Sequence, residues 1–162
     1  MGTSFQEVYA AFLARITADE WTLEEDLAIV ERDWQELLKM AIGRFKYPRV
    51  SLDFEEVEKE IDGKVIKEYQ FVDTLTNDEI QVLAIIMRYE WVSRCVASWE
   101  NIRQLYADRD FSQANHLDKL IKYEARLADT VDSALDDYDR SRNKRPALLF
   151  KKLAGKKNAK LY

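Results

Sequence analysis

Hydrophobic residues recur every three or four positions over most of the chain, which is the spacing of amphipathic helices. The first such stripe follows Ser4 and Glu7, two residues whose spacing is that of a capping box at a helix start. A second capping box, Thr22 with Glu25, opens a longer stripe that Pro48 brings to an end. The pattern predicts one helix of about four turns from residue 5 and a second over about 22–46.

The period shortens towards two between residues 50 and 72, where β-branched and aromatic residues flank Asp62-Gly63. This dipeptide is favoured in type I′ turns, in which both central residues need a positive φ. We therefore expect a β-hairpin with strands at about 56–61 and 64–71. Its many glutamates and lysines suit a hairpin that faces solvent or a partner. Because two strands alone are marginally stable, we expect the hairpin to pack against the helices. A surface loop is the alternative.

Helical spacing resumes at a third capping box, Thr76 with Glu79. The run that follows is apolar around more of its circumference than the others, so we expect it to be the central helix of the core. A shorter helical pattern covers about 98–107 and is interrupted at 108–110. The longest pattern begins at Ser112, and its apolar residues return about every 3.5 positions for about three heptads.

Together these patterns predict a mainly α protein, a bundle of about four to five helices with a long C-terminal helix, one inserted β-hairpin and an extended basic C-terminal tail. Residues 1–141 form the expected helical domain, with the hairpin inserted at about 50–72. From residue 142 to 162 the composition turns to Lys, Arg, Asn and Pro. We expect this arm to have little fixed structure of its own.

The composition is that of one folded domain, because 47% of the 162 residues are hydrophobic and 12% are aromatic. No run approaches the roughly 18 apolar residues that span a bilayer, and the N-terminus lacks the cationic start of a signal peptide. We therefore expect a protein without membrane contacts that is made in a cytoplasm. The chain has one cysteine, Cys95, and one histidine, His116, which excludes an internal disulfide and a Cys/His zinc site.

No motif with catalytic or cofactor chemistry is recognisable in the sequence. The four glycines lie far apart, so there is no glycine-rich phosphate loop, and His116 lacks partners for a metal site or a Ser-His-Asp triad. Two acidic clusters, within 53–56 and 132–139, lack the pattern of a calcium loop and are interpreted as solvated faces. We expect no enzyme activity, no cofactor and no metal. An unrecognised acidic metal site at 132–139 is the enzymatic alternative.

The net charge of −5 conceals an uneven distribution. From Arg140 onward there are nine Lys or Arg and no acidic residue, whereas the rest of the chain holds 16 basic and 30 acidic residues. The acidic body repels nucleic acid, while the arm offers a cationic surface to a partner. An apolar run at 146–150 lies between basic pairs, as in segments that dock into a groove with an acidic or phosphate rim. The candidate partner-binding residues are Arg142, Lys144, Arg145, Leu148, Leu149, Phe150, Lys151, Lys152 and Leu153. A solubilising end is the alternative.

Two stretches of the chain carry a family resemblance. The first is Leu75-Thr76-Asn77-Asp78-Glu79-Ile80, followed by Leu83, Ala84, Met87, Glu90 and Trp91; the second is Phe111, Ser112, Gln113, Ala114, Asn115, His116 and Leu117. With them the chain resembles the head–tail connector proteins, also called adaptor or head-completion proteins, of tailed bacteriophages and prophages of Gram-positive bacteria. The resemblance covers about residues 4–138, and its most specific element is Phe111–Leu117. The hairpin and the length of the basic arm depart from the family pattern.

The resemblance implies a helical-bundle subunit of the virion neck. Such subunits assemble, typically as twelve copies, into a ring beneath the portal that joins the DNA-filled head to the neck and tail proteins, and DNA passes through the lumen without sequence-specific binding. The resemblance places residues 142–162 on the portal or on a neighbouring copy. The alternatives are another neck component, such as a stopper or tail terminator, an unrelated helical adaptor, and a DNA-binding or regulatory protein that uses the basic arm on phosphates.

Overall fold

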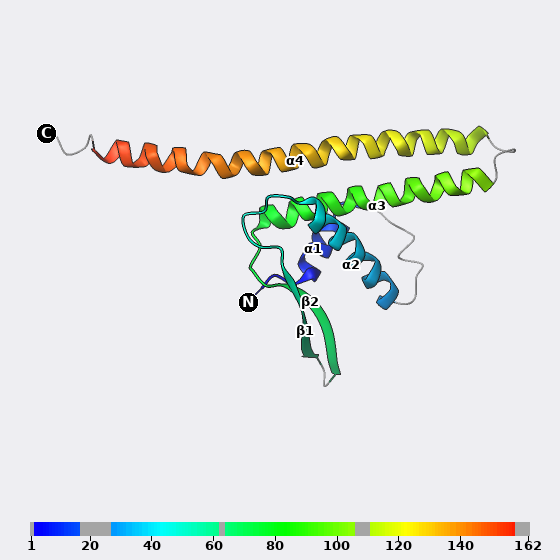
Figure 1. Cartoon of the computed structure of the whole chain (residues 1–162), viewed down its shortest axis with the longest axis horizontal. Helices are drawn as coiled ribbons and strands as arrows, with labels where there is room; N and C mark the ends of the chain where they lie inside the picture. Colours follow the sequence, from blue (N-terminus) through cyan, green and yellow to red (C-terminus); the bar gives the residue numbers. More distant parts are fainter. Residues whose placement is uncertain (1, 17–26, 62–63, 106–110, 158–162) are drawn as a thin grey trace.

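The computed structural model describes the backbone of residues 2–16, 27–61, 64–105 and 111–157, and the side chains of 2–16, 27–60, 65–100 and 116–141. In these ranges the chain forms four helices and one antiparallel two-stranded hairpin, which confirms the predicted mainly α fold (Figure 1). The elements are α1 (Phe5–Leu13), α2 (Leu27–Arg44), β1 (Phe54–Ile61), β2 (Lys64–Phe71), α3 (Asn77–Leu105) and α4 (Phe111–Lys157).

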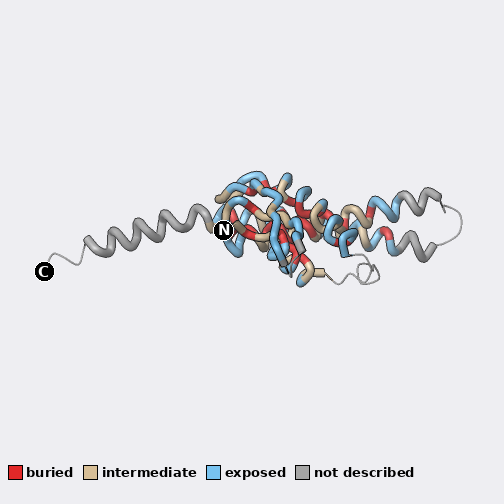
Figure 2. Tube along the Cα trace, turned by 90° about the horizontal axis from the view of Figure 1, so that it is seen from below, coloured by how far each residue is buried: buried red, intermediate tan, exposed pale blue. Residues whose placement is uncertain are grey.

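α3 is the central helix of the fold, in agreement with its apolar circumference. It packs against α1, α2 and α4. In Figure 1, α4 runs antiparallel to α3 on the side opposite α1 and α2, and buried positions gather where these elements overlap (Figure 2). The side chains with almost no exposed surface include Phe12 of α1, Leu37 and Leu38 of α2, Phe71 of β2, and Leu83, Ile86 and Met87 of α3.

Two of the three predicted helix starts are confirmed. At α1 the Ser4 hydroxyl accepts the Gln6 N–H at 3.2 Å, and the Glu7 carboxylate accepts the Ser4 N–H at 3.3 Å. At α3 the Glu79 carboxylate accepts both the Thr76 N–H, at 2.6 Å, and the Thr76 hydroxyl, at 2.5 Å. The residues of the second capping box, at 22 and 25, lie outside the described residues, and α2 is described from Leu27.

α1 is shorter than the predicted length of about four turns, because it ends at Leu13 after nine residues. Beyond it the N–H groups of Arg15 and Ile16 donate to carbonyls three positions back, which closes the chain into a turn.

The two long helices also differ from the expectation in their ends. α3 continues to Leu105, so the pattern at 98–107 is not a separate helix within the described residues. No glycine or proline occurs between Asn77 and Leu105 to break the helix. The last helix was expected to end near Ser141, but the backbone of α4 is helical to Lys157. Ala, Leu and Lys after the proline at 146 favour a helix. An interior proline costs about 3 kcal/mol, and nothing in the structure explains why the helix continues through it.

The hairpin is confirmed, with two more residues in β1 than predicted. Its strands pair from Phe54 opposite Phe71 to Ile61 opposite Lys64. At the base of the hairpin the ring of Phe5 lies 5.2 Å from that of Phe54 and 4.9 Å from that of Phe71, measured between centroids. Aromatic packing therefore fixes the base to α1, while the other end of the hairpin projects away from the helices (Figure 1).

The N-terminal residues pair with the end of β2. The Thr3 carbonyl accepts the Phe71 N–H at 2.8 Å, and the buried Thr3 hydroxyl accepts the Leu75 N–H at 2.8 Å. Gly2 has no side chain, and a Cβ there would lie 1.6 Å from the Phe71 carbonyl oxygen. The close approach therefore requires glycine, and Thr3 ties the hairpin to the segment that leads into α3.

Replacing Thr3 by valine tests this tie. Thr3→Val preserves the shape of the side chain but leaves the buried Leu75 N–H without an acceptor, so we expect the free energy of unfolding to fall by about 1–3 kcal/mol. Thr3→Ser, which keeps the hydroxyl, is the control and is expected to lose less. Chemical denaturation measures both variants, and equal stability of Thr3→Val and the parent chain would contradict the assignment.

Candidate functional site

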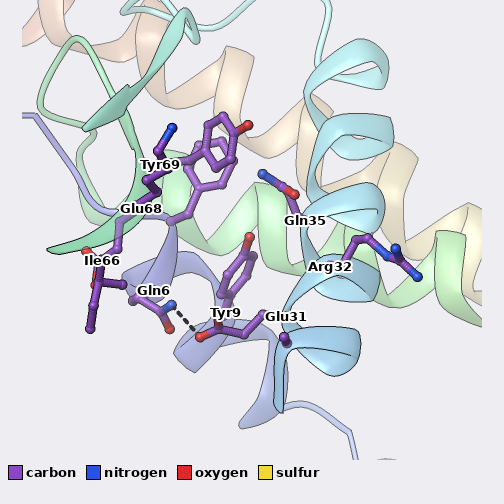
Figure 3. A pocket seen from close by; sticks show the side chains of 11 residues that line it. Gln6, Tyr9, Glu31, Arg32, Gln35, Ile66, Glu68 and Tyr69 are labelled. Atoms are coloured by element: carbon purple, nitrogen blue, oxygen red, sulfur yellow. Dashed lines mark hydrogen bonds between the residues drawn. The ribbon is translucent and has the colours of Figure 1, made fainter. Parts of the chain in front are cut away.

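An open cleft of about 290 Å³ lies between β2, α1 and the start of α2 (Figure 3). Gln6 of α1 donates a hydrogen bond to Glu31 of α2 at 3.2 Å across its wall. Tyr9 is buried beside it, and burial, together with the charge of Glu31, raises the pKa of the Tyr9 hydroxyl. The hydroxyl therefore stays protonated. The lining offers aromatic faces and hydrogen-bonding groups, and it contains no serine, cysteine or histidine among its described side chains.

A second groove, of about 530 Å³, lies between the segment after α2 and the middle of α4. One wall carries Arg44, Lys46 and the exposed ring of Tyr47. The other carries aspartates of α4 that are all exposed, so the interpretation of the cluster at 132–139 as a solvated face is confirmed; they are Asp132, Asp136 and Asp139. The groove thus joins an acidic wall to a basic and aromatic one.

The described residues hold neither a metal cluster nor a membrane span. No group of three or more His, Cys, Asp or Glu side chains in this part of the chain is arranged so that it could hold a metal ion. None of the described helices is both long enough and apolar enough to cross a bilayer.

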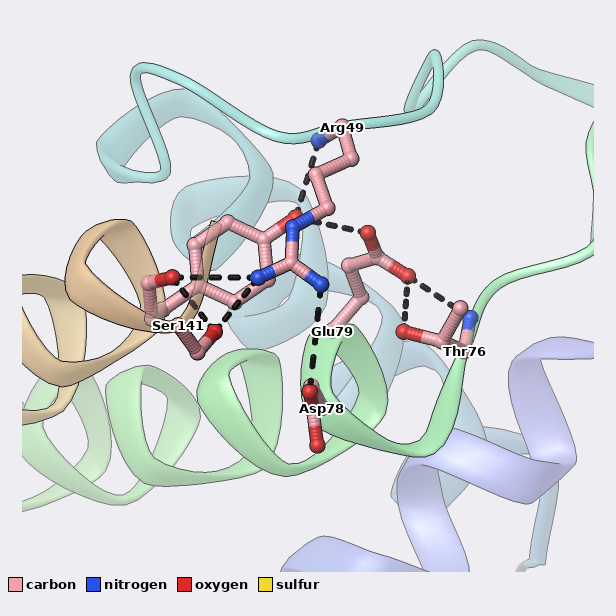
Figure 4. Close-up of polar contacts among 6 residues, drawn as sticks. Arg49, Thr76, Asp78, Glu79 and Ser141 are labelled. Atoms are coloured by element: carbon pink, nitrogen blue, oxygen red, sulfur yellow. Dashed lines mark hydrogen bonds and ion pairs between the residues drawn. The ribbon is translucent and has the colours of Figure 1, made fainter. Parts of the chain in front are cut away.

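The most tightly connected polar group in the structure joins α3 to α4. Glu79, in the first turn of α3, is fully buried. Its Oε2 accepts the two hydrogen bonds from Thr76, and its Oε1 accepts the hydroxyl of Tyr138 of α4 at 2.6 Å (Figure 4). A buried carboxylate is tolerated only when such partners replace water. Capping of α3 and attachment of α4 therefore depend on the same side chain.

Arg49, in the segment between α2 and β1, completes this group. Its backbone N–H donates to the Tyr138 hydroxyl at 2.8 Å, and its guanidinium donates to the Tyr138 carbonyl oxygen at 3.1 Å and to the Ser141 hydroxyl. The guanidinium also lies over the Tyr138 ring, 4.5 Å from its centroid. We call Arg49, Thr76, Glu79, Tyr138 and Ser141 the α4 clamp.

The environment of the clamp fixes its protonation states. Burial alone raises the pKa of the Glu79 carboxyl, but the hydrogen bonds from Thr76 and Tyr138 and the charge of Arg49 outweigh burial and hold it below its ordinary value. Burial, then the hydrogen bond to Glu79, raises the pKa of Tyr138 to about 12. Near neutral pH the carboxylate is therefore charged and the phenol protonated, which is the arrangement that the hydrogen bond needs.

The clamp lies immediately before the candidate partner-binding residues. Their backbone, at 142–153, continues α4, and their side chains lie outside the described residues. The family-motif residues begin the same helix: the side chains of 111–115 are outside the described residues, His116 is exposed and Leu117 is buried. Motif and arm are thus some 30 residues apart on one helix, about 45 Å at the α-helical rise. The structure does not bring them together.

Sequence reasoning identified Glu79 as a capping residue and Tyr138 as part of an apolar stripe, but it missed their contact with each other and the whole role of Arg49. Arg49 lies in a connecting segment, where residues follow no helical or strand periodicity that would mark its role. The one available hint was a phenol in the buried stripe of a helix, because a buried hydroxyl requires a partner.

Comparisons with known proteins find no match to this chain: no family model, no curated protein and no solved structure. The resemblance to head–tail connectors is therefore carried by the residues quoted above and stays a prediction.

Removing the Tyr138 hydroxyl tests the clamp. Tyr138→Phe leaves the Glu79 Oε1 and the Arg49 N–H without this partner, so we expect the free energy of unfolding to fall by about 1–3 kcal/mol. Tyr47→Phe is the matched control, because the Tyr47 side chain is 69% exposed; its effect is expected within about 0.5 kcal/mol. Thermal denaturation compares the two, and equal effects would contradict the clamp.

The lowered pKa of Glu79 predicts a pH dependence. Because the folded-state value lies below the unfolded-state value of about 4.3, the carboxylate stabilises the fold fully above that pH and less as pH falls through the folded-state value. Glu79→Gln has one acceptor oxygen in place of two, so it cannot accept the bonds from Thr76 on one atom and the Tyr138 hydroxyl on the other. We expect it to be less stable than the parent by about 1–3 kcal/mol at pH 7. The difference in the free energy of unfolding between the variant and the parent chain becomes smaller below about pH 4. Denaturant titrations at several pH values measure it, and a constant difference would contradict the assignment.

Proposed function

We propose that this protein is a structural subunit of the head–tail connector of a tailed bacteriophage. Copies close into a ring, typically of twelve, beneath the portal, and the ring joins the DNA-filled head to the neck and tail proteins. Its place is the neck of the virion, after assembly in the host cytoplasm. The protein acts by binding and needs no catalytic residue, cofactor or metal.

The observation that carries this proposal is the clamped, overlong helix. α4 has 47 residues, about 70 Å at the α-helical rise, against 29 in its neighbour α3. It is fixed at Tyr138 and Ser141 to the other elements and continues beyond them (Figure 1). The hairpin projects in a different direction. One copy thus presents two unlike projections, and unlike surfaces are what a ring of head-to-tail contacts requires.

The charge distribution supports a conduit rather than a DNA-binding protein. The chain up to residue 139 has 30 acidic and 16 basic residues, and a body of that charge repels phosphates. The nine basic residues from Arg140 onward suit an acidic protein surface. The apolar residues at 148–150 add a hydrophobic contact of the kind that protein grooves accept. A portal surface with an acidic rim is the partner that meets both requirements.

Truncation after Ser141 tests the proposal. The shortened chain keeps every residue of the α4 clamp and loses the arm, so we expect it to fold but to bind purified portal rings of the same phage more than tenfold more weakly than the full chain. Co-sedimentation measures the affinity, and circular dichroism checks the fold. A shortened chain that binds portal with unchanged affinity would contradict the proposed role of the arm.

A matched variant separates the two contributions of the arm. Replacing Leu148, Leu149 and Phe150 by serine keeps all nine basic residues, so portal binding that is lost in this variant depends on the apolar contact. The full chain is also titrated with duplex DNA at several salt concentrations. We expect weak binding; tight binding with a steep salt dependence would instead favour the DNA-binding function.

A further inference from the structure

Among the described residues, no backbone group pairs with the outer edge of β1 or with the projecting part of the outer edge of β2. The hairpin consists of two strands, so each strand has one edge that the other does not cover. On β2 only the base is covered, through the Thr3 carbonyl and a bridge between Ser4 and Gln70. The chain then turns away into α1, and the cleft of Figure 3 lies beside β2 from Ile66 to Tyr69.

The register tells which residues point their backbone groups outward. Ladder bonds alternate along an antiparallel pair, and the Val72 N–H donates to the Asp53 carbonyl while the Phe71 N–H points away to Thr3. On β2, the backbone N–H and C=O groups of residue 71 and of every second residue before it therefore point away from β1. Their register partners on β1 are residues 54, 56, 58 and 60. The outward positions are thus 54, 56, 58 and 60 on one edge, and 65, 67 and 69 on the other.

These two edges carry complementary side chains. On β1 the outward positions after Phe54 are all glutamate, namely Glu56, Glu58 and Glu60, and the strand has a formal charge of −3. On β2 they are Val65, Lys67 and Tyr69, and the strand has a formal charge of +1. Within the hairpin Lys67 already pairs with Glu56 at 2.9 Å and lies 4.0 Å from Glu58. Within the register of the hairpin, Glu58 and Lys67 are the directly opposite pair of unlike charge.

Pairing of like edges is disfavoured by the same pattern. Two β1 edges that pair along the glutamate run would place glutamates opposite glutamates, and two β2 edges centred on Lys67 would place lysine opposite lysine. Like charges directly opposite each other destabilise a strand pair, whereas opposite charges stabilise it. An acidic edge and a basic edge on the same hairpin therefore select a head-to-tail contact between copies.

We propose that hairpins of neighbouring copies pair edge to edge, β1 of one copy antiparallel to β2 of the next, with Glu58 of one opposite Lys67 of the other. All hairpins then point the same way, as rotational symmetry requires. The contact involves the projecting half of the hairpin, because paired strands lie only about 4.8 Å apart and the helical bodies need more room. This pairing specifies one interface of the ring and rests on the proposed function for the ring itself.

Disulfide exchange tests the pairing. Cys95→Ala removes the native thiol, and Glu58→Cys and Lys67→Cys are then made in separate chains. The two chains are mixed, assembled on portal rings and oxidised. We expect disulfide-linked dimers in the mixture and none from either chain alone, because only unlike edges meet. Lys59→Cys is the matched control for Glu58→Cys: it lies one residue further along β1 and points to the opposite face, so it should not link to Lys67→Cys.

The outcomes separate the pairing from the function. Rings that assemble on the portal without the mixed disulfide overturn the pairing and leave the connector function standing. Dimers of Glu58→Cys chains alone also overturn it, because they indicate contact between two β1 edges. Chains that neither associate nor bind the portal, judged by sedimentation, overturn the connector function.

A proline variant gives an independent measurement. Glu58→Pro removes one outward N–H without removing a bond of the hairpin's own ladder, whereas Glu58→Ala keeps that N–H. We expect Glu58→Pro to weaken self-association on the portal more than tenfold relative to Glu58→Ala, with the thermal transition of the free chain preserved in both. Equal association of the two variants would overturn the pairing.

Discussion

The fold depends on the buried carboxylate of Glu79. A charge without water must find hydrogen-bond donors inside the protein, and this one takes them from the start of its own helix and from Tyr138 on a distant helix. Arg49 then holds the same tyrosine from a third segment. Because a polar pair has stricter geometry than an apolar contact, this group fixes the position of α4 along α3 as well as their proximity.

The fixed position of α4 along α3 determines where the arm begins. The interface between α3 and α4 also contains buried apolar residues at helical spacing, such as Leu127 and Val131, and a second polar contact in which Arg88 donates to the Tyr123 hydroxyl. Apolar contacts alone would permit sliding by a turn. The clamp permits one placement. It therefore determines where the arm leaves the body, in the same way that the aromatic contacts around Phe5 determine where the hairpin leaves it. Both projections are held at their base by side-chain contacts.

The sequence predicts those parts of the fold that have a local cause. Capping residues marked the starts of α1 and α3, and Asp62-Gly63 with its flanking β-branched residues marked the hairpin. What it missed depends on residues far apart in the chain. Arg49 and Tyr138 are 89 positions apart, and neither carries a sign of the other. The uninterrupted run of α3 was missed as well: the pattern at 98–107 was interpreted as a shorter helix of its own, although no glycine or proline separates it from the preceding run.

Charge asymmetry recurs at two scales, and it has the same consequence at each. The chain as a whole joins an acidic body to a basic arm, and the hairpin joins an acidic strand to a basic one. In both cases two like surfaces repel and two unlike surfaces attract. In the connector that we propose, this pattern suits the basic arm to an acidic portal surface, and it favours head-to-tail pairing of hairpin edges over pairing across a two-fold axis. A two-fold contact would end at a dimer. The ring that we propose must close around a channel and therefore requires that option to be unfavourable, and the charges of the hairpin edges supply the repulsion.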